Sequence, residues 1–292
     1  MSIGICAYNE GRNIGSCLES ILSQRLQGLT LLEAVVVSSG STDDTDVVVR
    51  SFEERDARVR LVREERREGK NSAINLFLTL AKGDVLVLVN ADNRLEEGSL
   101  QALLEPLLDE EVGVVGGHPV PIDPRDSLAG VATHMLWEMH HRVALIYPKV
   151  GELMAFRPLG RSLPTSTQSD EDLIRMDLER RGMTTVYAPK AIVRNKGPGT
   201  VRDFVRQRTR VNIGEKYMKR LHGYDIPTWN SRYLFQAYLS YLRDTPDPLP
   251  LVLGAMLLEA YSRLYATVYV ALDKGDKAVW QQVSSTKDLG SR

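Results

Sequence analysis

The first half of the chain alternates short apolar runs with segments in which apolar residues recur at helical spacing. The apolar runs are rich in branched residues and mostly lack polar alternation, as in strands buried on both faces of a parallel sheet. We expect such strands at residues 3–7, 32–37, 59–62, 85–89 and 112–115. Helical spacing lies between them at residues 14–22, 73–81 and 100–108. This alternation predicts an α/β fold with a Rossmann-like, mostly parallel sheet flanked by helices.

The pattern becomes less regular after residue 116. Residues 119–125 are rich in proline and aspartate and predict a long loop, which a helix over residues 128–143 follows. Further on we expect a strand at 153–156, a helix at 172–181 that Gly182 ends, a strand at 185–187 and a basic helix at 201–217. We therefore predict one domain over residues 1–220, in two halves at 1–116 and 117–220.

The remaining residues, 221–292, are expected to form a helical C-terminal region. Its segment 249–272 is apolar and long enough to cross a bilayer, but Glu259 and Arg263 lie near its middle. Each charge would cost about 2.5 to 3.5 kcal/mol there on insertion scales. We therefore favour a helix at the membrane interface or in a dimer contact, because the aromatic segment 233–242 precedes it. A buried helix of the same domain is the alternative.

Composition excludes several classes of protein. With 43% hydrophobic and 26% charged residues in 292, the chain is globular. A formal net charge of −1 argues against binding of nucleic acid over a whole face. Cys6 and Cys17 alone give no disulfide framework or thiolate metal site. The first residues, MSIGICAYNE, lack the pattern of a signal peptide. We expect a cytoplasmic protein, or one at the cytoplasmic face of a membrane.

Polar clusters follow three of the predicted strands. They are Tyr8-Asn9-Glu10, the segment 38–43 and Asn90-Ala91-Asp92. Because the carboxyl ends of parallel strands share one edge of the sheet, the three clusters should converge on one crevice of nucleotide size. Within the second cluster, Gly40 to Asp43 can turn the chain and begin a helix whose N-terminus suits an anion.

These residues and their order resemble the inverting family 2 glycosyltransferases of the GT-A fold. The similar strings are ICAYNE, VVVSSGSTDDT, REGKNSAINLFLTLAKGDVLVLVNADN, SDEDLIRMDLERRG and RQRTR, and together they span residues 2–215. The resemblance implies transfer of a sugar from a nucleoside-diphosphate sugar to a lipid-linked or saccharide acceptor, assisted by Mg²⁺ or Mn²⁺. Residues 1–116 would bind the nucleotide, and residues 117–220 the acceptor.

The family's D-x-D metal element is incomplete in this chain. Asn90 replaces its first carboxylate and Asp92 stands at its second, with Ala91 between them. A divalent cation there neutralises the charge that builds on the leaving diphosphate. One carboxylate with water and phosphate oxygens can suffice for Mg²⁺, so the resemblance implies a metal at Asp92. The alternative is that Asp92 is a simple turn residue.

Other positions match the family's donor-binding residues. Ala7, Tyr8 and Glu10 match the segment that faces base and ribose. Ser39, like Ser38 before it, falls where members often carry the aspartate that reads a uracil edge, and a hydroxyl lacks that charge. Lys70 matches a basic residue that meets the donor diphosphate or ribose. The alternative for Lys70 is an exposed cation at the start of a helix.

An inverting transfer needs a carboxylate base near the acceptor oxygen. The family pattern puts Glu171 at that position, with Asp170 before it and Asp172 as a close competitor. Adjacent carboxylates raise one another's proton affinity, which favours a base. Ordinary acidic residues at a helix N-terminus are the alternative interpretation.

On the acceptor side, Gln207 and Arg210 match part of the family's Q-x-x-R-W element. Arg210 would pair with the diphosphate or an acceptor phosphate, whereas Val211 stands in place of the tryptophan that would stack on a sugar. This replacement argues against processive synthesis of long chains. Two rival functions remain open: a nucleotidyltransferase, and a non-catalytic scaffold of the same fold that binds nucleotide sugars.

Overall fold

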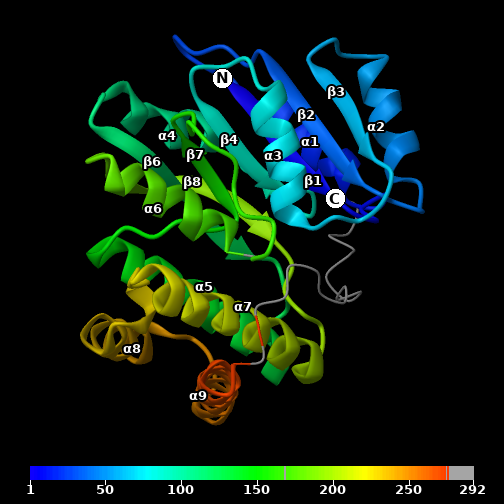
Figure 1. The fold of residues 1–292 in the computed structure, drawn as a ribbon. Coiled ribbons are helices and arrows are strands. Elements are labelled where there is room, and N and C mark those ends of the chain that lie inside the picture. The colour runs from blue at the N-terminus through cyan, green and yellow to red at the C-terminus, as the bar shows by residue number, and fades with distance from the viewer. Residues whose placement is uncertain (168, 274, 276–292) are drawn as a thin grey trace.

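The computed structural model describes residues 1–167, 169–273 and 275, and its centre is an eight-stranded sheet (Figure 1). The strand order is β3-β2-β1-β4-β7-β6-β8-β5, and pairing is parallel except where β7 and β5 join their neighbours. The strands are β1 (Ser2–Ala7), β2 (Glu33–Ser39), β3 (Val59–Glu64), β4 (Leu86–Asn90), β5 (Arg94–Leu95), β6 (Val112–Pro121), β7 (Leu153–Phe156) and β8 (Thr184–Asn195). The predicted mostly parallel α/β sheet is confirmed.

Helices cover both faces of this sheet. One face packs against α1 (Ile14–Leu22), α2 (Thr45–Glu53) and α4 (Ser99–Leu104), and the other against α3 (Lys70–Leu80) and α6 (Asp170–Arg180). Alternate side chains of a strand serve opposite faces, so Val36 packs with the α1 side while Val35 and Val37 pack with the α3 side. Burial on both faces explains why these strands are continuously apolar.

Several boundaries differ from the sequence prediction, and the strand expected at 185–187 extends over the whole of β8. Residues 119–121 were expected in a loop, but β6 continues through them and pairs with β8 as far as Pro121 opposite Asn195. Its pairing with β7 ends at Gly116, so these prolines lie where one flank of β6 has no neighbouring strand and no donor is needed. The helix expected at 100–108 ends at Leu104, and a 3₁₀ turn, η1 (Glu105–Leu108), continues it because Pro106 cannot extend the α-helical hydrogen bonding.

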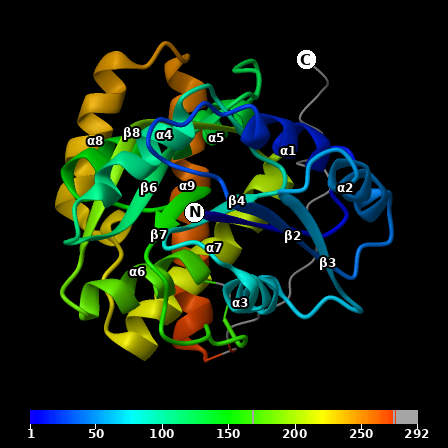
Figure 2. The same cartoon turned by 90° about the horizontal axis from the view of Figure 1, so that it is seen from above.

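The remaining helices form a layer against one edge of the sheet (Figure 1). They are α5 (Leu128–Ile146), α7 (Val201–His222), α8 (Ser231–Asp244) and α9 (Leu249–Ala271), with the short 3₁₀ turn η2 (Pro227–Trp229) before α8. Figure 2, seen from above, shows α9 running lengthwise beneath the sheet, and it packs against both α5 and α7. The division at residue 220 stays a prediction, and residues 274 and 276–292 of the C-terminal region lie outside the described residues.

Helix α9 buries one face and exposes the other. Its inward side includes Val252, Ala255, Glu259 and Ala266, so the two charges in mid-helix are explained by contacts inside the protein. Its outward side is a row of large apolar residues: Leu249, Leu253, Leu257, Tyr261, Leu264, Tyr265 and Val268. Length and hydropathy alone would let α9 cross a membrane, yet a buried core helix meets the same criterion.

Candidate active site

The loops after β1 and β2 are joined by hydrogen bonds. Asn9 has a positive φ of 53°. Its side-chain Oδ1 accepts a hydrogen bond from the Thr42 backbone amide at 2.8 Å, and its backbone amide donates to Ser41 Oγ at 3.1 Å. The Glu10 amide donates to Thr45 Oγ1 at 2.8 Å. A strained backbone at Asn9 is held by these bonds, so the first two polar clusters form one rigid rim.

A cavity of about 440 Å³ opens at this rim, where the ends of β1 and β4 meet α6 and α7. Of the segment 38–43 only Ser39 lines it, but the other nominated site residues do: Ala7, Tyr8, Glu10, Lys70, Asn90, Ala91, Asp92, Asp170, Glu171, Asp172, Gln207 and Arg210. These residues come from positions more than two hundred apart in the chain. Their shared location leaves the role of each one as a prediction.

The start of α6 carries three carboxylates that face the start of α3. Lys70 Nζ lies 2.8 Å from Asp170 Oδ2 and 3.7 Å from Glu171 Oε1. Burial alone would lower the pKa of Lys70, but these two carboxylates raise it instead. Lys70 therefore stays charged and pairs with the acidic turn, while 37% of its side-chain surface remains exposed at the start of α3.

Burial changes the proton affinity of two of these carboxylates. Burial raises the pKa of Glu171 to about 8, with Lys70 opposing the shift. It raises the pKa of Asp172 to about 6, with Lys149 opposing it. A carboxylate with a pKa close to neutral is suited to accept a proton during catalysis.

Asp92 faces a carboxylate that sequence reasoning missed. Burial and then the charge of Glu152 raise the pKa of Asp92 to about 7. In the part of the chain that the structure describes, no three His, Cys, Asp or Glu side chains group closely enough to hold a metal by themselves. The oxygen donors of Asp92 and Glu152 nevertheless fit a Mg²⁺ or Mn²⁺ ion that takes its other ligands from water and phosphate.

Two further residues that sequence reasoning missed, Arg67 and Glu64, lie near the ends of β1 and β2. The Arg67 guanidinium lies 4.3 Å from the ring centroid of Tyr8 and lines the cavity, which adds a cation beside Lys70 and Arg210. The Ser39 hydroxyl donates to Glu64 Oε2 on the neighbouring β3. No spacing signal marks either residue, because each is brought in by strand pairing or by a loop.

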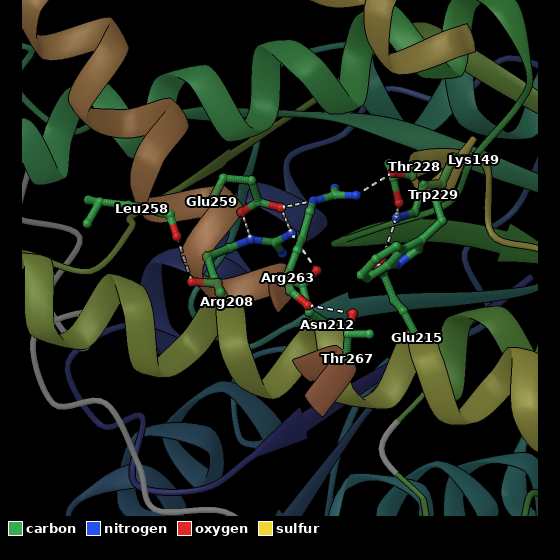
Figure 3. Close-up of polar contacts among 11 residues, drawn as sticks. Lys149, Arg208, Asn212, Glu215, Thr228, Trp229, Leu258, Glu259, Arg263 and Thr267 are labelled. Carbon is green, nitrogen blue, oxygen red and sulfur yellow. Dashed lines mark hydrogen bonds and ion pairs between the residues drawn. The ribbon is translucent and has the colours of Figure 1, made fainter. Parts of the chain in front are cut away.

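The far end of the cavity reaches a buried network of charges between α7 and α9 (Figure 3). Arg208 binds Glu259 through Nε and one terminal nitrogen at 2.9 Å each, and Arg263 Nε binds the same carboxylate at 2.7 Å. Alongside, Glu215 accepts from Lys149 at 2.9 Å and from Trp229 at 2.7 Å. The two arginines override burial and lower the pKa of Glu259 to about 2.

Apolar side chains complete this end of the cavity. They come from α5, α7 and α8 and comprise Met135, Leu136, Met139, Phe204, Leu234 and Tyr238. The cavity thus joins a charged end at the strand edge to a mixed apolar and ionic end below it. A ligand that fills both would carry a polar group and an apolar part.

Comparison with known proteins agrees with this architecture. The family model "Glycosyl transferase family 2" matches residues 2–163, and "Glycosyl transferase family group 2" matches residues 85–272. The chain is 29% identical over 127 residues to glycosyltransferase GlyG of Streptococcus pneumoniae, a match that covers 44% of this chain and 41% of GlyG. It is 24% identical over 242 residues to the uncharacterized glycosyltransferase YibD of Escherichia coli, a match that covers 81% of this chain and 57% of YibD. The matches thus span about half the length of these curated relatives.

Among solved structures, the mannosyltransferase PcManGT of Pyrobaculum calidifontis, in complex with GDP-Man and Mn²⁺, is similar in fold. Its TM-score is 0.66 at 22% identity, over 94% of this chain and 87% of that one. The identity is low, so this likeness concerns the fold. The first family model covers more than half of the chain. The chain belongs to glycosyl transferase family 2.

Proposed function

We propose that this protein is an inverting glycosyltransferase that moves a sugar from a nucleoside-diphosphate sugar to an acceptor hydroxyl. The observation that carries the proposal is the single cavity that gathers the β1 and β2 loops, Asp92, Lys70 and the acidic start of α6. Family membership supports it, as does the similar fold of PcManGT, a mannosyltransferase whose structure was solved in complex with GDP-Man and Mn²⁺.

The donor would lie across the ends of β1, β2 and β4. Ala7, Tyr8, Glu10 and Ser39 would face the nucleoside, while Lys70 and Arg210 would offset the charge of the diphosphate. Asp92 would hold Mg²⁺ or Mn²⁺, with Asn90 and Ala91 beside the donor. When bound, the cation stabilises the charge that develops on the departing nucleoside diphosphate.

Glu171 is the residue we assign as base. Asp170 is 4% exposed and lies in direct ion-pair distance of Lys70, and Asp172 is 8% exposed, whereas the Glu171 side chain keeps 31% of its surface accessible. Glu171 would take the proton of the acceptor hydroxyl as that oxygen attacks the anomeric carbon. The bond to the diphosphate breaks on the opposite side of the sugar, which inverts the configuration.

The acceptor end of the cavity favours a lipid-linked acceptor over a plain saccharide. Six apolar side chains line it, and the cations Lys149, Arg208 and Arg263 stand among them. Apolar walls suit a hydrocarbon chain, and the cations suit the phosphate of a lipid carrier. Gln207 and Arg210, at the junction of the two ends, would position the acceptor near the donor.

Contact with a membrane would bring such an acceptor to the enzyme. The outward row of α9, with Leu257 70% and Leu264 65% exposed, is the surface we assign to that contact. The protein would then act at the cytoplasmic face of the membrane. A homodimer that covers the same row is the competing arrangement, and we expect no binding of nucleic acid.

The reaction type is tested by incubating the full chain with UDP- and GDP-sugars and Mn²⁺, and analysing the released products. Release of a nucleoside diphosphate is expected and should vanish in Asp92→Ala. Asp84→Ala, an exposed aspartate before the opposite end of β4, is the matched control and should keep activity. Release of pyrophosphate would indicate a nucleotidyltransferase, and nucleotide binding without turnover for any donor or acceptor would indicate a scaffold.

A further inference from the structure

Strand pairing brings Glu152 beside Asn90, the residue that stands at the first carboxylate position of the D-x-D element, although the two lie far apart in the sequence. Strand β7 pairs antiparallel with β4 in a register that sets Leu153 opposite Val89. One step further along this register, Glu152 comes opposite Asn90, at the carboxyl end of β4. The carboxylate therefore reaches, from a separate part of the chain, the position where the element itself has an amide.

Two asparagine side chains hold the Glu152 carboxylate in place. The Asn90 amide donates to Glu152 Oε2. Asn93 Nδ2 donates to the same Oε2 and to the Glu152 backbone carbonyl, both at 3.2 Å. Among the described residues, both side chains that donate to this carboxylate donate to Oε2, so Oε1 is available to a ligand.

This arrangement has a cost. The side chain of Asn93 is fully buried, and within the described part of the chain its Oδ1 has no hydrogen-bond partner. A buried polar atom without a partner costs about 1 to 3 kcal/mol. Asn93 keeps its amide nitrogen on Glu152, so this buried side chain fixes the position of the carboxylate despite that cost.

The surroundings of Glu152 call for a cation. Asp92 and Glu152 line the same cavity as Lys70 and Arg210, whose positive charges offset part of the repulsion between the two carboxylates. The two carboxylates still repel each other, and a divalent cation bound between them would relieve that repulsion. Divalent ions at phosphate sites are commonly held by one or two carboxylates, with the phosphate supplying further oxygens.

We infer that Glu152 is the second carboxylate of the metal site and replaces, from β7, the one that Asn90 lacks. This inference rests on the proposed function, because it assumes a metal-bound nucleoside diphosphate at Asp92. It explains how the chain can dispense with the first aspartate of the element. In this arrangement Asn90 has a new task, since its amide orients Glu152.

The inference is tested by measuring Mn²⁺ binding by electron paramagnetic resonance, in the presence of UDP or GDP. Glu152→Gln keeps an oxygen for the two asparagine amides but removes the charge. We expect it to weaken Mn²⁺ binding about tenfold or more. Glu110→Gln, an exposed glutamate elsewhere, should bind Mn²⁺ like the wild type.

A carboxylate swap separates a ligand from a structural residue. Asn90→Asp combined with Glu152→Gln restores the number of carboxylates, and Mn²⁺ affinity should recover to within a few fold of the wild type. Affinity that stays low in the swap, while the metal-free unfolding temperature is normal, would overturn the inference. So would unchanged Mn²⁺ affinity in Glu152→Gln when Asp92→Asn loses it, although the proposed function would then stand. A wild type that binds neither nucleotide nor Mn²⁺ would instead contradict the proposed function.

Discussion

Single residues at this site have chemistries that depend on what faces them. Lys70 and Glu171 are both ionisable groups in one cavity, yet the pKa of each is raised for a different reason. At Lys70 burial lowers the pKa but the neighbouring carboxylates together outweigh it, whereas at Glu171 burial itself raises the pKa. The lysine is thereby kept charged, while the pKa of the glutamate lies close to the neutral range that suits the proposed base.

Substitution of Glu171 tests the assignment of the base. Glu171→Gln should lower turnover about 10²- to 10⁴-fold, the range for loss of a general base, with donor binding retained. Asp172→Asn should retain most activity. Both are measured as release of nucleoside diphosphate alongside nucleotide binding. Equal losses in the two variants would contradict the assignment.

The same residue predicts the pH dependence of the reaction. Only the deprotonated carboxylate accepts a proton, and burial raises the pKa of Glu171 to about 8. Single-turnover rates in the wild type should therefore rise with pH and level off above about pH 8. The rising limb should be absent from the residual activity of Glu171→Gln, and its persistence there would assign it to another group.

At the scale of elements, pairs of neighbouring segments build the site. The loops after β1 and β2 lock together through Asn9, and β7 brings Glu152 alongside β4. Helices α7 and α9 are joined by the ionic network around Glu259. Breaking a buried ion pair of this kind costs free energy of folding, because loss of one partner leaves a buried charge without compensation.

The network around Glu259 predicts acid sensitivity. Its pKa is lowered from 4.5 to about 2, so its contribution to stability is present above pH 4.5 and is lost as the pH falls toward 2. About 2 kcal/mol of that contribution should disappear between pH 6 and pH 3. Urea unfolding of Glu259→Gln at both pH values should show a smaller loss than the wild type.

The control for this prediction is Glu138→Gln. Glu138 also pairs with an arginine four residues away, Arg142, but its side chain is 37% exposed. The pH dependence of its free energy of unfolding should match the wild type. If the free energy of unfolding of Glu259→Gln depends on pH as strongly as that of the wild type, other groups account for the acid sensitivity.

The backbone conformation of Gly40, in the turn after β2, leads to a separate prediction about stability. Gly40 has φ of +66°, and a Cβ there would lie 2.8 Å from the Arg66 backbone. Gly28 has φ of +68°, with nothing within 4 Å of such a Cβ. Gly28→Ala should cost about 1 to 2 kcal/mol of unfolding free energy, from the backbone alone. Gly40→Ala should cost about 1 to 3 kcal/mol more because of the clash, and equal costs in thermal or urea unfolding would contradict this.

The whole molecule combines a buried sheet with one exposed apolar surface. The sheet is covered on both faces. The layer of α5, α7, α8 and α9 lies against one edge of it (Figure 1), and side chains of these helices line the far end of the cavity. The outer row of α9 is left uncovered in this arrangement. Large exposed apolar surfaces are usually covered by a membrane or by another protein.

Charge introduced on that row tests the membrane contact. Leu257→Glu should leave the unfolding temperature within a few degrees of the wild type, since Leu257 is 70% exposed, and should abolish sedimentation with vesicles of anionic lipid. Val47→Glu, at a position 68% exposed on α2, should have no effect on vesicle binding. A wild type that ignores vesicles but dimerises, and becomes monomeric in Leu257→Glu, would assign the row to a dimer contact.

The sequence by itself determined the parts of this protein that depend on local patterns. Continuous apolar runs predicted the central strands, and helical spacing predicted most helices. The polar clusters after β1, β2 and β4 predicted one crevice, because parallel strands end at a common edge. Boundaries were less secure where prolines lie in β6, because their effect depends on whether a neighbouring strand needs their missing donor.

Only the tertiary structure decided which distant residues complete the site. Asn90 and Glu152 are 62 positions apart, and antiparallel pairing of β7 with β4 brings them together. In the same way, Glu259 in mid-helix looked like a charge against membrane insertion until α7 supplied Arg208. Such contacts leave no periodic trace in the sequence, because register and helix packing are set by the whole core and not by neighbouring residues.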